Sequence, residues 1–248
     1  MRKLFFLVIS LTVTSCTEPL KDVEYDNLVT RGGVFYEKFS NEPYSGRTTG
    51  DWQGQIVAGL WQGNVAVYRP DGTLWWEIPF KKGIRDGEYK AWCHNGNIQT
   101  QFKYKNGKRD GLVESYRCDG SLALQMKFKE GQPTGSHVRA FHSNGNLSIE
   151  IPLKNGKTDG KVINRFADGE LQSFASWKNG MLNGECERYT KEGTRRYQLT
   201  FNEGELIGVI LDGLDKYKRG SIDLLSPDSD LKNRIRWCQH DPNNYRND

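Results

Sequence analysis

Glycines recur along this chain at a fixed spacing, and this periodicity constrains the fold more than any other feature of the sequence. Three series of glycines keep a frame of 24 residues, with one step of 25 in each series. The first is Gly63, Gly87, Gly111, Gly135, Gly160, Gly184 and Gly208; the second is Gly72, Gly96, Gly120, Gly145, Gly169 and Gly193; the third is Gly83, Gly107, Gly131, Gly156, Gly180 and Gly204. Such a period is typical of repeat proteins whose units pack only on their neighbours.

Each repeat has the pattern of a β-hairpin. After the middle glycine, apolar and polar residues alternate, as over residues 98–105, and this period of two is typical of a strand with one buried face. Asn or Asp precedes the middle glycine in most repeats, and these pairs are expected to supply the positive φ angles of tight turns. We therefore assign all three glycine series to turns.

The hairpins together predict an all-β fold, an elongated antiparallel meander of stacked hairpins over residues 46–208. Residues 46–62 form an irregular first unit, and a twisted sheet of this length is expected to curl around its apolar face. Pro79 and Pro152 lie at equivalent positions inside expected strands. Because proline cannot donate a ladder hydrogen bond, we expect the sheet to bulge there.

Both ends of the chain depart from the repeat. Residues 16–45 are expected to contain a polar tether and an N-terminal cap strand around Val34–Tyr36, and residues 209–248 to form a C-terminal cap. Within that cap, Ser226 and Pro227 have the residue types of a helix N-cap and first helical position. The helix that follows is amphipathic, with Leu231, Ile235 and Cys238 on one face. It is expected to cover the exposed end of the stack.

Residues 1–15 have the pattern of a signal peptide, because Arg2 and Lys3 precede an apolar run of about ten residues, too short to span a bilayer. Small residues followed by Cys16 resemble a bacterial lipobox, which implies that Cys16 becomes a lipid-modified N-terminus. An ordinary cleaved signal peptide is the alternative. Thr17 replaces the aspartate that retains lipoproteins in the inner membrane, so the resemblance implies an outer-membrane anchor facing the periplasm.

Composition and motifs give no sign of catalysis. The net charge of +4 falls to +2 without Arg2 and Lys3, too little to indicate nucleic-acid binding. The chain has no nucleophile, metalloprotease or phosphate-loop motif, so we predict no enzymatic activity and no cofactor. His94 and His142 lie two repeats apart, roughly 20 Å by strand spacing, so no metal site is predicted.

Four cysteines remain after Cys16, and an envelope location favours disulfides between them. Cys93 and Cys118 precede equivalent turns of adjacent repeats, so we predict that they are bonded. A bond between Cys186 and Cys238 would tie the C-terminal cap to the last repeats. The alternative is four free, buried thiols.

Two groups of residues are candidates for partner binding. One is a row of lysines, each nine residues after a middle glycine: Lys81, Lys105, Lys129, Lys154 and Lys178. A basic strip suits an acidic partner or lipid headgroups, whereas the alternative is a solvated edge partly paired with Asp86, Asp110 and Asp159. The other group is Trp75 and Phe174, which interrupt the polar face and are expected to be exposed unless the ends of the chain pack on them.

The repeats resemble MORN-variant repeats, in which an aromatic residue precedes Asn-Gly or Asp-Gly, alternation follows, and Lys-x-Gly-x-x-x-Gly closes the unit. The segment from Arg31 to Tyr36 and the segment from Glu42 to Gly46 are similar to the region before the repeats in the bacterial YwqK-type family, often labelled as antitoxins. The resemblance covers roughly residues 28–208. The irregular first unit and the extra residue before Phe141 depart from it.

This resemblance implies a protein that binds and neutralises a toxin. With the lipid anchor, it leads to the hypothesis of a periplasmic immunity protein that occludes a toxic effector enzyme. The alternatives are an envelope scaffold and a lipoprotein that binds lipid through its lysine row.

Overall fold

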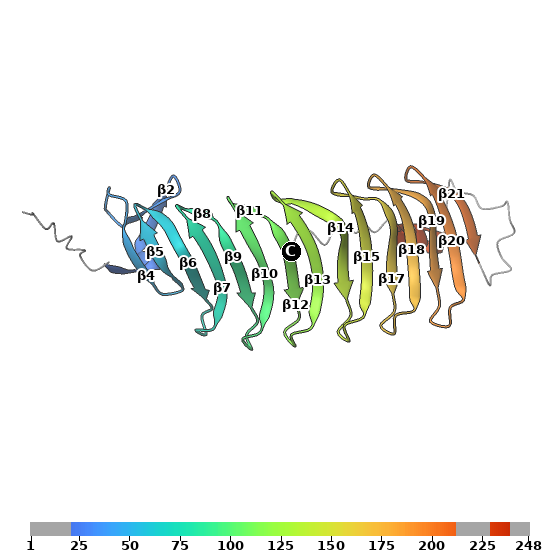
Figure 1. The fold of residues 1–248 in the computed structure, drawn as a ribbon, viewed down its shortest axis with the longest axis horizontal. Coiled ribbons are helices and arrows are strands. Elements are labelled where there is room, and N and C mark those ends of the chain that lie inside the picture. The colour runs from blue at the N-terminus through green and yellow to red at the C-terminus, as the bar shows by residue number, and fades with distance from the viewer. Residues whose placement is uncertain (1–20, 212–228, 239–248) are drawn as a thin grey trace, which may run out of the picture.

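The computed structural model describes residues 21–211 and 229–238 and consists mainly of one long, twisted sheet (Figure 1). From β4 onward the strands pair antiparallel in chain order, so the all-β meander predicted from the glycine frame is confirmed. The short strands β8, β11 and β16 pair with the same preceding strand as the longer strand that follows each of them. The strands of this array are β4 (Gly46–Thr49), β5 (Trp52–Val57), β6 (Leu60–Tyr68), β7 (Leu74–Lys81), β8 (Ile84–Arg85), β9 (Gly87–Trp92), β10 (Ile98–Lys105), β11 (Lys108–Arg109), β12 (Gly111–Tyr116), β13 (Leu122–Lys129), β14 (Gln132–Phe141), β15 (Leu147–Lys154), β16 (Lys157–Thr158), β17 (Gly160–Arg165), β18 (Leu171–Lys178), β19 (Met181–Tyr189), β20 (Arg195–Asn202) and β21 (Glu205–Leu211).

Two kinds of turn connect the strands. The sequence predicted the pair of positive φ angles at the middle turns, but the structure has it at the turns of the late glycines. The late glycine ends a two-residue turn in which both residues have positive φ, as at Asn106 (49°) and Gly107 (79°). At the middle turns only the glycine has positive φ, for example Gly96 at 84°. The preceding Asn95 instead accepts a hydrogen bond at its side-chain oxygen from the Asn97 N–H, 3.2 Å away.

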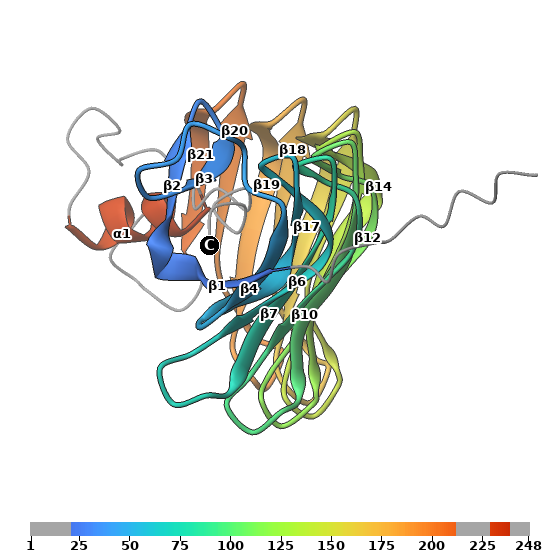
Figure 2. The same ribbon diagram turned by 90° about the vertical axis from the view of Figure 1, so that its left-hand side faces the viewer.

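The first glycine series marks β-bulges rather than turns. Gln101 pairs with Glu114 and Tyr104 pairs with Arg109, so three steps along β10 correspond to five along the opposing strand. Gly111 lies in this bulge with φ of 109°. A bulge bends and twists its strand, and its repetition accounts for the arched sheet in Figure 2.

The prolines are not the cause of the bulging. The Asp86 N–H donates to the Pro79 carbonyl at 3.0 Å, and the Asp110 N–H makes the equivalent bond to Lys103 at 2.9 Å. The same bulge therefore forms with or without proline. In the repeat with the 25-residue step, Gln125 pairs with Arg139 and Phe128 pairs with Pro133. Three steps along β13 therefore correspond to six along β14, one more than in the repeat described above. The extra residue is thus absorbed into the bulge, and the strands on either side stay in phase.

The apolar side chains gather on one face of the sheet, which we call the inner face. The main cluster includes Phe102, Val113, Met126, Ile151 and Leu199, all at least nine-tenths buried. A second cluster at the N-terminal end is built on Ile56, Trp61 and Val65. Because every strand contributes alternate residues to this face, the core runs along the array instead of forming one compact centre.

Part of the expected tether is folded. Asp22–Glu24 form β1, which pairs parallel with β4, and Tyr25–Asn27 form a 3-10 turn. With three residues and one apolar side chain, Val23, β1 is too short to show alternation, which is why the sequence did not reveal it. The expected cap strand is present as β3 (Val34–Glu37), paired with β2 (Leu28–Arg31).

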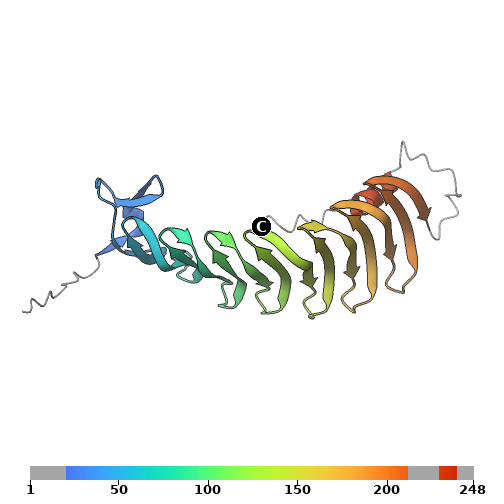
Figure 3. The same ribbon diagram turned by 45° about the horizontal axis from the view of Figure 1, so that its top comes forward.

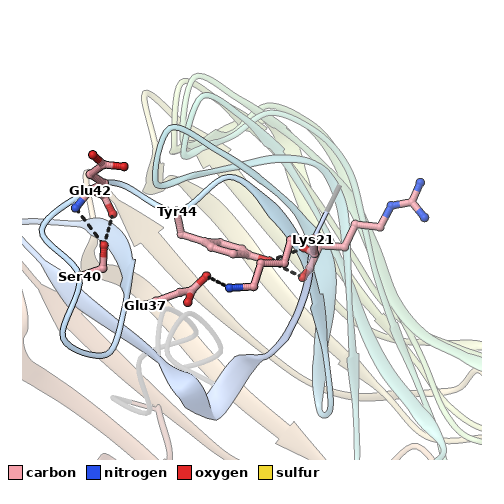
Figure 4. A network of polar contacts seen from close by, with 6 residues as sticks. Lys21, Glu37, Ser40, Glu42 and Tyr44 are labelled. Carbon is pink, nitrogen blue, oxygen red and sulfur yellow. Dashed lines mark hydrogen bonds and ion pairs between the residues drawn. The ribbon is translucent and has the colours of Figure 1, made fainter. Parts of the chain in front are cut away.

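The chain enters this cap through a network of polar contacts (Figure 4). The Tyr44 hydroxyl lies 2.7 Å from the Lys21 carbonyl oxygen and 2.8 Å from that of Arg47, and the Lys21 ammonium pairs with Glu37 at 2.7 Å. A Cβ at position 46 would overlap both the Tyr44 hydroxyl and the Lys21 carbonyl, so Gly46 is needed for this close approach. The network fixes the start of the folded chain against β3.

The C-terminal helix, α1 (Ser229–Cys238), lies against the inner face of the last repeats. Cys238 is bonded to Cys186 in β19, Ile235 packs on the main core cluster, and the Arg234 guanidinium lies 5.1 Å from the Tyr197 ring centroid in β20. The expected N-cap residues, Ser226 and Pro227, and the Leu231 side chain lie outside the described residues. Figure 2 shows α1 and the β2–β3 hairpin on the same side of the sheet, and Figure 3 shows them at its two ends.

Candidate functional site

One repeat position distinguishes the middle of the inner face from its two ends. This position, two residues after the late glycine or its counterpart Gly59, holds Trp61, Arg85, Arg109, Pro133, Thr158, Leu182 and Leu206 in chain order. At the N-terminal end, Trp61 is buried and contacts Phe35 and Tyr25 of the cap. At the other end, Leu182 is buried in the cluster that also contains Cys238. Arginine occurs between these two covered ends.

The two arginines lie over aromatic rings. The Arg85 guanidinium is 5.5 Å from the Tyr104 ring centroid, and one of its nitrogens lies 3.3 Å from the Tyr104 hydroxyl. The Arg109 guanidinium is 5.0 Å from the Phe102 centroid and 5.6 Å from that of Phe128. These are cation–π distances, so the rings fix the position of each charge.

The rings beneath the arginines pack into one group. Tyr89 stacks on Phe102 with centroids 4.6 Å apart, and Phe102 meets Tyr104 edge-on at 5.0 Å. Burial raises the pKa of the Tyr89 hydroxyl and Tyr104 adds to this effect, whereas Arg85 and Arg109 act in the opposite direction. The Tyr89 hydroxyl is therefore protonated at neutral pH, and it lies close enough to both guanidiniums to interact with them electrostatically. We call Arg85, Tyr89, Phe102, Tyr104 and Arg109 the aromatic–arginine surface.

No carboxylate balances the two arginines across this surface. Neither Arg85 nor Arg109 forms an ion pair with any residue in the described part of the chain. The nearest acids in the repeat frame, Asp86 and Asp110, lie in the bulges, where their side chains accept hydrogen bonds from the backbone of the next turn. This surface was not predicted from the sequence, although aligning the repeats on the late glycine shows arginine at a position where the other repeats have uncharged residues.

Both cysteine pairs expected from the sequence are bonded. Cys93–Cys118 links the middle turns of two adjacent repeats, with 5.6 Å between Cα atoms, and Cys186–Cys238 holds α1 on β19. Cys118 also presents its carbonyl to the side-chain amides of Asn95 and Asn97, at 2.6 and 2.8 Å. The first disulfide therefore joins the ends of β9 and β12 that are remote from Arg85 and Arg109, and the second holds the C-terminal helix.

The lysine row forms an exposed line beside the two-residue turns. Lys81, Lys105, Lys129, Lys154 and Lys178 all end their strands and are exposed. Among the residues described, only Lys129 of this row forms an ion pair, with Asp110 at 3.1 Å. The acids have another role, because the Asp86 carboxylate accepts the Asn106 N–H and the Asp159 carboxylate accepts the Asn179 N–H. Pairing between the two rows is thus confined to one position.

The structure separates the two aromatic candidates of the polar face. Trp75 is 37% exposed and lies within 5.4 Å of the Arg69 guanidinium, so its expected exposure is confirmed. The exposure expected for Phe174 is wrong, because that side chain is only 9% exposed. Ile163 and Glu187 flank it in register, and the Lys161 ammonium lies 4.1 Å from its ring centroid. The flanking side chains of adjacent strands cover the ring.

Phe174→Ala is therefore expected to destabilise the fold by about 2–3 kcal/mol, toward the lower end for a buried phenylalanine because only the outer-face neighbours cover it. Trp75→Ala is expected to change the free energy of unfolding by less than about 1 kcal/mol. Urea unfolding of the two variants tests this difference. Equal destabilisation by both would contradict the placement of Phe174.

The remaining polar groups form contacts of a structural kind. His142 Nε2 lies 2.9 Å from the Arg165 carbonyl oxygen of the next repeat, and exposed His94 lies 3.7 Å from Asp71. Within residues 21–211 and 229–238, no three His, Cys, Asp or Glu side chains cluster as metal ligands would. No helix in the described ranges is long and apolar enough to cross a bilayer. Cys16 and His240 lie outside those ranges.

Comparisons with protein-family models and with curated proteins find no match for this chain. The MORN-like pattern and the resemblance to the YwqK-type family therefore stay predictions from the residues themselves. The structure establishes the stacked-hairpin fold on its own evidence. The aromatic–arginine surface is the strongest candidate site that this fold presents.

Proposed function

We propose that this protein is a lipid-anchored immunity protein of the bacterial envelope, which binds a toxic effector enzyme and blocks it by occlusion. The observation that supports a binding role is the positively charged middle of the inner face, which no other described segment covers. Both ends of that face are covered by other parts of the chain, and the middle holds two arginines that have no carboxylate partner within residues 21–211 and 229–238. Rigid rings and prepositioned guanidiniums are typical of protein-binding surfaces.

The proposal combines this surface with the two sequence hypotheses. The resemblance to YwqK-type proteins supports a toxin as the partner, and the lipobox resemblance at Cys16 supports an anchor facing the periplasm. Lys21 is held against Glu37 and Tyr44, so only four residues separate Cys16 from Lys21, the fixed start of the fold. An anchored protein would be held at the membrane that an arriving effector must pass.

Co-expression with the protein encoded by the adjoining gene tests the function. We expect that protein, sent to the periplasm alone, to stop growth, and the full chain to restore growth and to co-purify with it. A Cys16→Ala variant should lose palmitate labelling, which tests the anchor separately. Unchanged toxicity together with no complex would refute the proposal.

The lysine row supports a second candidate, an envelope lipoprotein that contacts anionic lipid. Lys105 and Lys154 each pair in register with a further lysine, Lys108 and Lys157, so the basic edge is doubled at two points. Lys105→Glu combined with Lys129→Glu should abolish salt-sensitive binding of the chain to anionic vesicles. Binding that survives this change would exclude the lysine row as a lipid contact.

A further inference from the structure

We infer that the aromatic–arginine surface takes an acidic segment of the partner protein, whose carboxylates pair with Arg85 and Arg109. This inference rests on the proposed binding function and specifies the surface and the chemistry of the partner. It follows from the charge, the spacing and the hydrogen-bonding capacity of this part of the inner face.

Charge comes first. Arg85 is exposed and Arg109 is half-buried, and both lie on a face whose neighbouring strand positions carry aromatic, aliphatic and hydroxyl side chains. The corresponding positions at the two ends of the array are filled by Trp61 and Leu182, which are buried by the chain itself. Exposure to solvent alone would explain polar residues on this face. It does not explain two arginines without a carboxylate partner among the described residues. Carboxylates are the complementary group.

The hydrogen-bonding capacity of the arginines suits carboxylates. A guanidinium carries five N–H donors in a planar fork that matches the two oxygens of a carboxylate. Arg85 donates one of these N–H groups to the Tyr104 hydroxyl. The rings fix both arginines in place, so less side-chain entropy is lost when an acid binds.

Spacing defines the partner further. Arg85 and Arg109 occupy equivalent positions of adjacent repeats, two strand spacings apart, which is roughly 10 Å. An extended segment crossing the strands presents every second side chain to the surface, about 6.6 Å or 13 Å apart, so carboxylates two or four residues apart bracket that separation. Tyr89 and Tyr104, both half-buried, lie between and beside the arginines and offer ring surface to an aromatic or aliphatic side chain of the segment.

Fluorescence anisotropy with two labelled copolymers tests the inference on the full chain. Poly(Glu,Tyr) presents carboxylates among aromatic rings, and poly(Lys,Tyr) has the same rings with the opposite charge. We expect the chain to bind the acidic copolymer and not the basic one. Arg85→Gln combined with Arg109→Gln should weaken binding at least tenfold.

A matched variant separates a specific surface from general electrostatics. Lys103→Gln combined with Lys127→Gln removes the same charge from exposed residues of β10 and β13 on the opposite face, and should leave binding within about twofold. Arg85→Lys with Arg109→Lys keeps the charge but loses the planar fork, so its binding should be intermediate. Equal weakening by the arginine-to-glutamine and lysine-to-glutamine pairs, or no binding by the unaltered chain, would overturn the inference.

Two further readouts keep this inference apart from the proposed function. If the arginine-to-glutamine variant still rescues growth from the toxin, the function stands and the inferred surface is wrong. If copolymer binding depends on the arginines but no toxin is neutralised, the surface stands and the function is wrong. Sedimentation of the chain alone addresses a second copy as occupant, because dimerisation that is lost in the arginine variant would overturn an acidic partner segment.

Discussion

Replacing Cys186 and Cys238 together with alanine is expected to lower the free energy of unfolding by about 4 kcal/mol. The two residues are separated by 52 positions in the sequence, and closing a loop of that size restricts the unfolded chain by about this amount. Both sulfurs are buried, so alanine avoids placing a hydroxyl in the core. The loss should also release α1 from the inner face and uncover apolar side chains of β19 and β20.

Urea unfolding and dye binding measure the two parts of this expectation. The matched control is Cys93→Ala with Cys118→Ala, which opens a loop of 25 residues and should destabilise the protein by about 3.5 kcal/mol. Only the first pair of substitutions should increase the binding of a hydrophobic dye under native conditions, because only it holds a helix over the core. Dye binding that rises equally in both variants would contradict the role of α1 as a cover.

Ile151→Ala is expected to destabilise the protein by about 3–4 kcal/mol. Ile151 is 2% exposed in β15 and belongs to the main core cluster, and loss of such a side chain leaves a cavity as well as less apolar burial. Because each repeat packs only on its neighbours, a weak point in the middle should also let the two halves of the array unfold separately. The unfolding transition in urea should therefore become broader as well as earlier.

Leu112→Ala is the matched control for that substitution. Leu112 also lies in the middle of the array, but it is 49% exposed on the outer face, and its removal should change stability by less than about 0.5 kcal/mol. A similar shift for both variants would mean that burial on the inner face does not dominate the stability of the stack. An unchanged transition width for Ile151→Ala would mean that the array unfolds as a single unit.

The sequence predicted the fold because the glycine frame and the alternation determine it together. It could not separate turn glycines from bulge glycines, since both need positive φ. Gly107 closes a two-residue turn and Gly111 lies in a bulge, yet the two are only four residues apart in the same pattern. Register decides between these roles, and register is a property of the paired strands. The folding of Asp22–Glu24 was also hidden, because a strand of three residues with one apolar side chain is too short to show a period of two.

Site residues were harder to predict than the fold. Phe174 looked exposed because alternation placed it on the polar face, but Ile163 and Lys161 of the adjacent strand cover it. Arg85 and Arg109 looked like ordinary surface cations near a turn. They stand out only by comparison with the same repeat position elsewhere, which holds Trp61 under the N-terminal cap and Leu182 beside α1. Those residues are covered by tertiary contacts, which the local sequence pattern does not predict.

The central claim is that the partner binds the inner face between its two covered ends. Hydroxyl-radical footprinting of the full chain, alone and with the protein encoded by the adjoining gene, tests this claim most directly. Tyr104 reports on the aromatic–arginine surface, and exposed Trp75, at the start of β7, reports on the end of that strand remote from Arg85. We predict that complex formation protects Tyr104 from oxidation and leaves Trp75 unchanged. Protection of Trp75 with no change at Tyr104 would contradict the account.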